Sequence, residues 1–350
     1  MTEIIELAAG NLISPIILSF VLGLCAALAR SDLTIPEAVA KGMSIYLLFA
    51  IGFKGGAGVA AHGVDATLVL TLLVAAILSF GLPFIGFALL SVMSRFSTID
   101  KAAVAAHYGS ISIVTFVAAT SVLQAQGIAS EGYMVAAAAV MEAPAILSAL
   151  FIVARAGGAS RGTVDAGLYR EILLNGSIVL LVGSFFIGAI TGEEGLATIS
   201  PFIVAPFQGV LCLFLLDMGL VAGRGLRESR GELGLGPIAF GMLMPLIGSS
   251  FGLIGALLAG LSPGGAALLM TLSASASYIA VPAAMRVALP EARPSIYLTL
   301  SLGVTFPFNL TVGIPLYTAL STAFVGVGRP TAMGALIGRR PLQGRLHGAA

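Results

Sequence analysis

Long apolar runs, separated by short segments that hold most of the charges, constrain the fold of this chain more than any other feature. An α-helix needs about 20 apolar residues to cross the hydrocarbon core of a bilayer. Charged residues make up only 9% of the 350 residues and hydrophobic residues 58%, whereas soluble domains have about 25% charged residues. We therefore predict an all-α membrane protein with ten transmembrane helices, at residues 11–29, 37–60, 66–93, 99–124, 132–155, 172–191, 202–225, 236–260, 264–287 and 294–324.

The Lys and Arg residues fall in alternate loops between these runs. Twelve of the 17 follow the odd-numbered runs, and the opposite loops hold only Lys54. Because cytoplasmic loops carry the excess of positive charge, we predict a multi-pass protein of the bacterial inner membrane with both termini outside. Residues 325–350 hold the other four Arg residues, which run against this orientation, and their Gly- and Arg-rich sequence predicts a disordered tail. The twelve are Arg30, Lys41, Arg95, Lys101, Arg155, Arg161, Arg170, Arg224, Arg227, Arg230, Arg286 and Arg293.

The second half of the chain repeats the first at a shift of 165 residues, or 162 residues in the third helix. Five helices are an odd number, so the second copy has to cross the membrane in the opposite sense. Inverted repeats of this kind are typical of secondary transporters. We predict two five-helix repeats, 11–155 and 172–324. The matching pairs include Ser19 and Ser184, Pro36 and Pro201, Pro83 and Pro245, Ser110 and Ser275, and Ser112 and Ser277.

The fourth helix of each repeat carries alternating small and hydroxyl residues, Gly109-Ser110-Ile111-Ser112 and Ala274-Ser275-Ala276-Ser277. Serine side chains compete for backbone hydrogen bonds and weaken a helix, so we predict that helices four and nine are discontinuous. The inverted topology would then aim two helix N-termini at one central point, which favours a small anion. The alternative interpretation is close helix packing through small residues.

Two carboxylates lie inside predicted helices, Glu142 in helix five and Asp217 in helix seven. Ionisable groups at membrane depth are functional hypotheses by default, and these could hold Na⁺ or carry a proton. Asn309 in helix ten could supply a carbonyl ligand. For each of the three, an interhelical hydrogen bond is the structural alternative.

Other functional classes find no support in the sequence. Cys25 and Cys212 lie in apolar runs without disulfide or transition-metal spacing. The formal net charge of +1 does not indicate nucleic acid as a partner. No hydrolase, nucleotide-binding or redox motif occurs, so we predict neither an enzyme nor an ATP-driven pump.

The chain resembles the SbtA family of sodium-dependent bicarbonate transporters. The resemblance is carried by stretches that sample residues 12–324, namely Gly109–Phe116, Tyr133–Ile146, Leu216–Gly223, Ser275–Arg286 and Leu302–Thr311. It implies a ten-helix protomer whose core and gate domains each draw on both repeats. It further implies a homotrimer that takes up bicarbonate with Na⁺ as coupling ion and without another cofactor, by an elevator-like or rocking movement.

Carried over to this sequence, the resemblance implies that Ser110, Ser112, Ser275 and Ser277 face bicarbonate. It places Na⁺ nearby, and we expect its ligands among Thr115, Glu142, Asp217 and Asn309. Some members have a PII-like cytoplasmic partner, and whether this chain has one stays open. Serine hydroxyls and amides can bind many small anions, so these residues do not identify the anion. Transport of another small anion, such as a monocarboxylate, is one alternative, and a passive anion channel is another.

Overall fold

A computed structural model describes residues 14–63, 65–155, 176–228 and 233–326. Within these ranges the chain forms helices and no strand. Eight of the helical segments are long and apolar enough to cross a membrane, and two further apolar helices, Pro15–Leu28 and Pro263–Ala274, are shorter. The predicted tail lies almost wholly outside the described residues.

The described helices follow the predicted runs closely. They are α2 (Pro15–Leu28), α3 (Glu37–His62), α4 (Ala66–Met93), α5 (Thr98–Gly109), α6 (Ile113–Ala125), α7 (Met134–Val140), α8 (Ala143–Arg155), α10 (Gly176–Ile203), α11 (Phe207–Glu228), α12 (Leu235–Ala259), α13 (Pro263–Ala274), α14 (Ala280–Ala288), α15 (Pro294–Leu298), η1 (Thr299–Thr305), α16 (Phe306–Phe308), η2 (Asn309–Gly313) and α17 (Ile314–Gly326).

The boundaries have identifiable local causes. Helix α4 begins after Asp65, whose carboxylate accepts a hydrogen bond from Leu68 N at 2.8 Å, and it covers the predicted range 66–93. An N-cap of this kind satisfies one of the free amides of the first turn.

The structure differs from the predicted helices at two places. The sixth run was predicted to end at residue 191, but α10 continues to Ile203 across a kink at Gly192, whose φ is 60°. Glycine tolerates this left-handed conformation without a Cβ clash. The fifth run, predicted as one helix, is interrupted between α7 and α8 at Met141 and Glu142.

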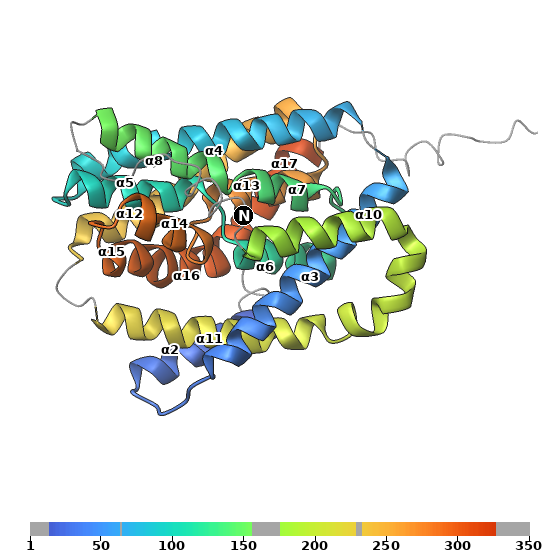
Figure 1. Cartoon of the computed structure of the whole chain (residues 1–350), viewed down its shortest axis with the longest axis horizontal. Helices are drawn as coiled ribbons and strands as arrows, with labels where there is room; N and C mark the ends of the chain where they lie inside the picture. The colour runs from blue at the N-terminus through green and yellow to red at the C-terminus, as the bar shows by residue number, and fades with distance from the viewer. Residues whose placement is uncertain (1–13, 64, 156–175, 229–232, 327–350) are drawn as a thin grey trace, which may run out of the picture.

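The helices divide into two groups by their packing (Figure 1). Helix α2 packs along α11 and α3 along α10, and the four form one group. Glycines allow these pairs to approach closely: a Cβ at Gly23 would fall on the Leu216 carbonyl oxygen, and one at Gly56 on that of Phe185. The second group contains α4 to α8, α12 to α14 and α17, among which α12 packs along both α4 and α13.

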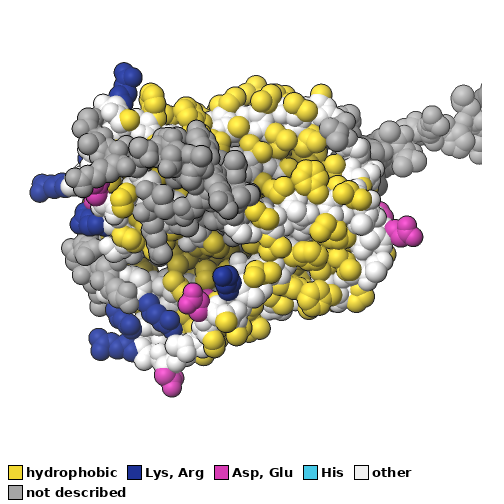
Figure 2. Space-filling view, in the orientation of Figure 1, with side chains coloured by type: hydrophobic (Ala, Val, Ile, Leu, Met, Phe, Trp, Pro, Cys, Tyr) yellow, Lys and Arg dark blue, Asp and Glu magenta, His cyan; other side chains and the backbone are white. Residues whose placement is uncertain are grey.

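Charged and apolar side chains separate along the long axis of the molecule (Figure 2). In this view most of the visible Lys and Arg side chains lie at the left end, and hydrophobic side chains cover the surface to the right. Large apolar residues are exposed in this protein, for example Ile77 at 69% and Ile190 at 83%. An apolar belt of this kind is what a bilayer covers.

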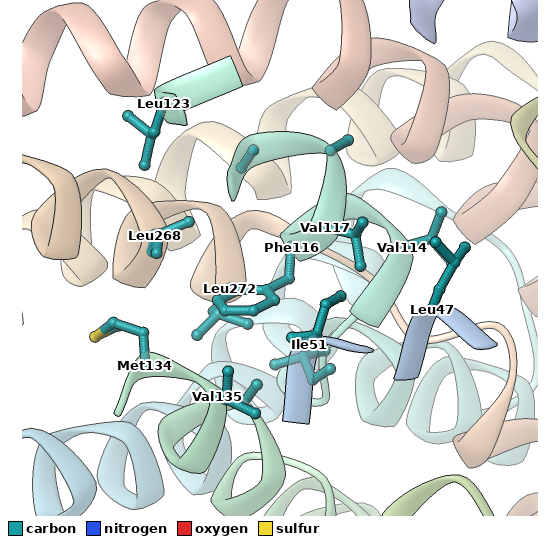
Figure 3. Close-up of a cluster of buried hydrophobic side chains, with 14 of the residues drawn as sticks. Leu47, Ile51, Val114, Phe116, Val117, Leu123, Met134, Val135, Leu268 and Leu272 are labelled. Atoms are coloured by element: carbon teal, nitrogen blue, oxygen red, sulfur yellow. The ribbon is translucent and has the colours of Figure 1, made fainter. Parts of the chain in front are cut away.

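Apolar side chains fill the contact between the two groups (Figure 3). Leu47 and Ile51 of α3 meet Val114 and Val117 of α6, and Val135 of α7 lies beside them. All five are buried. Such a contact is held by dispersion and shape and not by directional bonds.

Candidate functional site

The first break separates α5 from α6 at Ser110, Ile111 and Ser112. The Ser112 hydroxyl caps α6 by accepting a hydrogen bond from Thr115 N at 3.2 Å. Behind the break, Gly109 lies against Pro83 of α4, where a Cβ would fall on the proline ring. The break predicted for the fourth helix is therefore present.

The second break separates α13 from α14 at Ser275–Ile279. The Ser277 hydroxyl accepts a hydrogen bond from Val281 N at 3.3 Å, in the first turn of α14. Behind this break, Gly248 of α12 lies against the backbone of Ser273. The ninth helix is therefore discontinuous, as predicted.

The two breaks contact each other at the centre of the protein. Ser112 N donates to the Ser275 hydroxyl at 2.9 Å, and Ser277 N donates to the His107 carbonyl at 2.8 Å. Serines 110, 112, 275 and 277 are each at most 3% exposed. Residues about 165 positions apart thus form one closed polar site.

The site presents more hydrogen-bond donors than its protein partners use. Within the described ranges, the amides of Ile113 and Val114 at the start of α6 have no backbone or side-chain acceptor. The Ser112 oxygen accepts from both the amide and the hydroxyl of Thr115, at 3.2 and 2.9 Å, so its own proton is left for another acceptor. Amides at a helix N-terminus and free hydroxyls together suit an anion.

Glu142 brings a carboxylate to the first break. It lies in the interruption between α7 and α8, and its Oε2 accepts a hydrogen bond from the Ser110 hydroxyl at 3.0 Å. The interruption is held in place by Ser79 of α4, whose hydroxyl donates to the Met141 carbonyl at 2.6 Å. Glu142 is 8% exposed, and no Lys, Arg or His forms an ion pair with it in the described part of the chain.

Asn309 brings an amide to the second break. Its Nδ2 donates to the Ala274 carbonyl at 2.9 Å, at the end of α13. Its Oδ1 accepts from the Tyr317 hydroxyl at 2.9 Å. The side chain is fully buried and lies where the helix widens into the π-helical segment η2.

The remaining predicted cation ligands are placed differently. Thr115 lies in the first turn of α6, beside Ser112. Asp217 lies in α11, in the other helix group, and is 7% exposed. Across the described ranges, no hydrogen bond or ion pair joins Asp217 to either break. Hydrogen bonds therefore connect Thr115, Glu142 and Asn309 to the breaks, and among the described residues none connects Asp217 to them.

Two aromatic residues at the site were not among the predicted bicarbonate or sodium ligands. His107 is fully buried and stacks on Tyr297, with ring centroids 4.3 Å apart. Tyr278 lies within the second break, with its hydroxyl near Ser112, although that hydroxyl makes no hydrogen bond of normal geometry to the described residues. Tyr278 follows directly on the serine motif, which was the only signal for it.

Each broken helix is clamped at its outer end by a residue from the loop that follows the other broken helix. Glu131, after α6, accepts from Ser262 N at 2.7 Å and from its hydroxyl at 2.9 Å, at the start of α13. Arg293, after α14, donates from its Nη2 to Asp100 at 2.9 Å near the start of α5. Its backbone amide donates to the same carboxylate at 2.9 Å.

Comparison with known families gives one match. The family model described as the Na⁺-dependent bicarbonate transporter superfamily matches residues 15–322, which include both breaks and both clamps. None of the curated proteins compared with the chain matches it.

Proposed function

Because the chain belongs to the Na⁺-dependent bicarbonate transporter superfamily, we propose that it is a symporter that carries bicarbonate and Na⁺ into the cell together. Bicarbonate that enters against an inside-negative potential costs about 2.3 kcal/mol per 100 mV. One accompanying Na⁺ cancels this cost. A tenfold Na⁺ gradient then supplies about 1.4 kcal/mol, which supports roughly tenfold accumulation.

The observation that carries this proposal is the meeting of the two breaks. The start of α6 presents the free amides of Ile113 and Val114, and the second break lies beside it through the bond from Ser112 N to the Ser275 hydroxyl. Discontinuous helices whose N-termini face a midplane site are the usual anion sites of secondary transporters. We place bicarbonate at Gly109–Ser112 and Ala274–Ser277.

The four predicted Na⁺ ligands differ in how well their positions and free oxygen atoms support that role. Thr115 and Glu142 lie beside the first break and offer oxygen atoms, which suit a hard cation. Both polar groups of Asn309 already have protein partners, so it would act through a remaining lone pair. Asp217 would belong to a separate position in the other helix group.

The two helix groups correspond to the proposed gate and core domains. The group of α2, α3, α10 and α11 would be the gate, and the group that holds both breaks would be the core. The apolar contact in Figure 3 would let the core slide or rock against the gate without breaking hydrogen bonds at that contact. The paired clamps, Glu131 on Ser262 and Arg293 on Asp100, support the inverted five-helix repeats.

The proposal extends to the setting of the protein. We place the basic end of Figure 2 in the cytoplasm of a bacterium and both termini outside, across the inner membrane. A homotrimer is proposed from the resemblance. A PII-like partner stays a prediction, since most of the loop between helices five and six lies outside the described residues.

The test is uptake of labelled bicarbonate into proteoliposomes with and without an inward Na⁺ gradient. We expect uptake to rise with the gradient and to fall at least tenfold in Ser110→Ala, because the hydroxyl that holds the Glu142 carboxylate at the first break is lost with little steric change. Ser91→Ala, an exposed serine of α4 whose hydroxyl bonds only within its own helix, is the matched control.

Two other outcomes would replace the proposal. Uptake that is indifferent to Na⁺ would indicate a passive anion channel or a different coupling ion. No bicarbonate uptake, together with uptake of a monocarboxylate, would leave the architecture in place and change the substrate.

A further inference from the structure

The anion site contains one acidic group among many donors. On the donor side are the amides of Ile113 and Val114 and the proton of Ser112. On the acceptor side, the Glu142 carboxylate bonds directly to the first break through Ser110. Any anion satisfies donors, so the donors alone do not distinguish one small anion from another.

Glu142 has accepting capacity that the protein leaves unused. An ionised carboxylate has about four lone-pair positions, and the hydrogen bond from Ser110 at 3.0 Å uses one. None of the described residues forms an ion pair with it, and it keeps 8% of its surface accessible although it lies in the interior. A buried carboxylate in this state either takes up a proton or binds a hydrogen-bond donor or a cation from outside the protein.

Bicarbonate differs from most small anions in carrying an O–H group. We infer that Glu142 accepts the O–H of bicarbonate and so selects an anion that brings its own proton donor. This inference rests on the proposed function, and it gives Glu142 a role toward the substrate in place of the predicted role as a Na⁺ ligand.

The selectivity follows from what a competing anion lacks. Formate and nitrate are planar and monovalent like bicarbonate, and the donors of the site would bind their oxygens equally well. Neither has an O–H, so each would set an oxygen lone pair against the Glu142 carboxylate. A site built to bond a donor rejects an analogue without one, because its buried acceptor is left unpaired.

The test uses the full chain in proteoliposomes with an inward Na⁺ gradient, and formate and nitrate as competitors of labelled bicarbonate uptake. For the wild type we expect neither anion to compete at tenfold excess. For Glu142→Gln we expect the half-saturating bicarbonate concentration to rise at least tenfold. The same variant should be inhibited by formate at a concentration at least tenfold lower, because the Gln amide can donate to an anion that lacks a proton.

Two further variants keep the test decisive. Glu193→Gln makes the same chemical change at an exposed position of α10 and should leave uptake and competition unchanged. Glu142→Asp keeps an acceptor, so it should still reject formate even where its bicarbonate affinity falls. If Glu142→Gln does not assemble, anion binding to purified Glu142→Asp, measured by thermal shift, decides between the outcomes.

The contrary outcomes are distinct. If Glu142→Gln raises the half-saturating Na⁺ concentration but leaves the ratio of formate to bicarbonate inhibition unchanged, Glu142 is a sodium ligand and this inference is wrong while the proposed function stands. If Glu142→Asp binds formate as well as bicarbonate, the inference is wrong as well. If the wild type takes up no bicarbonate under a Na⁺ gradient, the proposed function fails and this inference fails with it.

Discussion

The two helix breaks are built alike, but the side chain that hydrogen-bonds to the first is an acceptor and the one that hydrogen-bonds to the second is a donor. At the first, Glu142 from the following helix accepts a hydrogen bond from Ser110. At the second, Asn309 from the following helix donates one to Ala274. The first break is therefore hydrogen-bonded to a carboxylate acceptor, and the second break to a neutral amide. Two breaks of similar build can thus carry different polar partners, because one break is free to specialise while the other maintains the backbone geometry.

The largest expected effect concerns the glycines behind the breaks. In Gly248→Ala the new Cβ falls on the Ser273 carbonyl oxygen, and in Gly109→Ala it falls on the Pro83 ring. Neither neighbour can move freely, so we expect a loss above the roughly 1–3 kcal/mol that is typical of overpacking, and above about 4 kcal/mol at Gly248. We expect the larger loss at Gly248, where the neighbour is backbone.

Thermal unfolding in detergent measures this difference. Gly183→Ala, in α10 with open space at its Cβ position, is the control and should not destabilise the protein. Equal stability of Gly248→Ala and the wild type would show that the second break is not packed as described.

The second-largest loss of stability is expected when Asn309, the neutral partner of the second break, is replaced. Asn309→Ala leaves the Ala274 carbonyl and the Tyr317 hydroxyl without their bonds, and each buried group left unsatisfied costs about 1–3 kcal/mol. We expect a loss of about 2–4 kcal/mol in unfolding free energy, by thermal or denaturant unfolding. A loss below about 1 kcal/mol would mean that Asn309 serves mainly as an ion ligand, and Na⁺ dependence of uptake would then be the property to change.

A smaller loss of stability should distinguish the two helix caps formed by Ser112 and Ser277. Ser112 accepts from both polar groups of Thr115, whereas Ser277 accepts from Val281 N at the longer distance of 3.3 Å. Loss of a serine cap costs about 1 kcal/mol, so Ser112→Ala should exceed that value and Ser277→Ala should fall below it. The reverse order in thermal unfolding would contradict the view that the first break is the more tightly built.

The smallest loss of stability is expected at the two clamps, Arg293 on Asp100 and Glu131 on Ser262. Arg293 is 55% exposed at its side chain, and in Arg293→Ala the Asp100 carboxylate keeps its bonds to Ser97 and to the backbone amide of residue 293. Exposed ion pairs contribute about 0–1 kcal/mol. Glu131→Ala should cost more, because Ser262 loses the acceptor of both its amide and its hydroxyl. Denaturant unfolding at two salt concentrations compares them, and only Arg293→Ala should lose its effect at high salt.

The structural features that the sequence predicts correctly are those that local residue properties determine. Ten apolar segments, the range of α4 and both serine breaks follow from length, capping residues and weak helix formers. The interruption at Met141 and Glu142 was missed because the preceding segment is rich in alanine, a strong helix former. The one available signal was Pro144, which has no amide to continue the helical hydrogen bonds.

Other features depend on contacts between distant parts of the chain. The clamp of Glu131 on Ser262 joins residues 131 positions apart, and that of Arg293 on Asp100 joins residues 193 positions apart. The helix group to which Asp217 belongs depends on how α11 packs against α2. Neither can be obtained from local propensity, because tertiary packing decides which faces meet.

The crossed bonds between the breaks also set the order in which the protein can be built during synthesis. Among the described residues, Ser112 N has its acceptor in Ser275, and the His107 carbonyl has its donor in Ser277. A nascent chain that has placed its first five helices in the membrane therefore holds an unfinished half-site with unsatisfied backbone groups. The ribosome has to add about 120 residues beyond Arg155, the end of α8, before Ser275 is made, so the first five helices depend on lipid headgroups, water or the insertion machinery until the second break arrives.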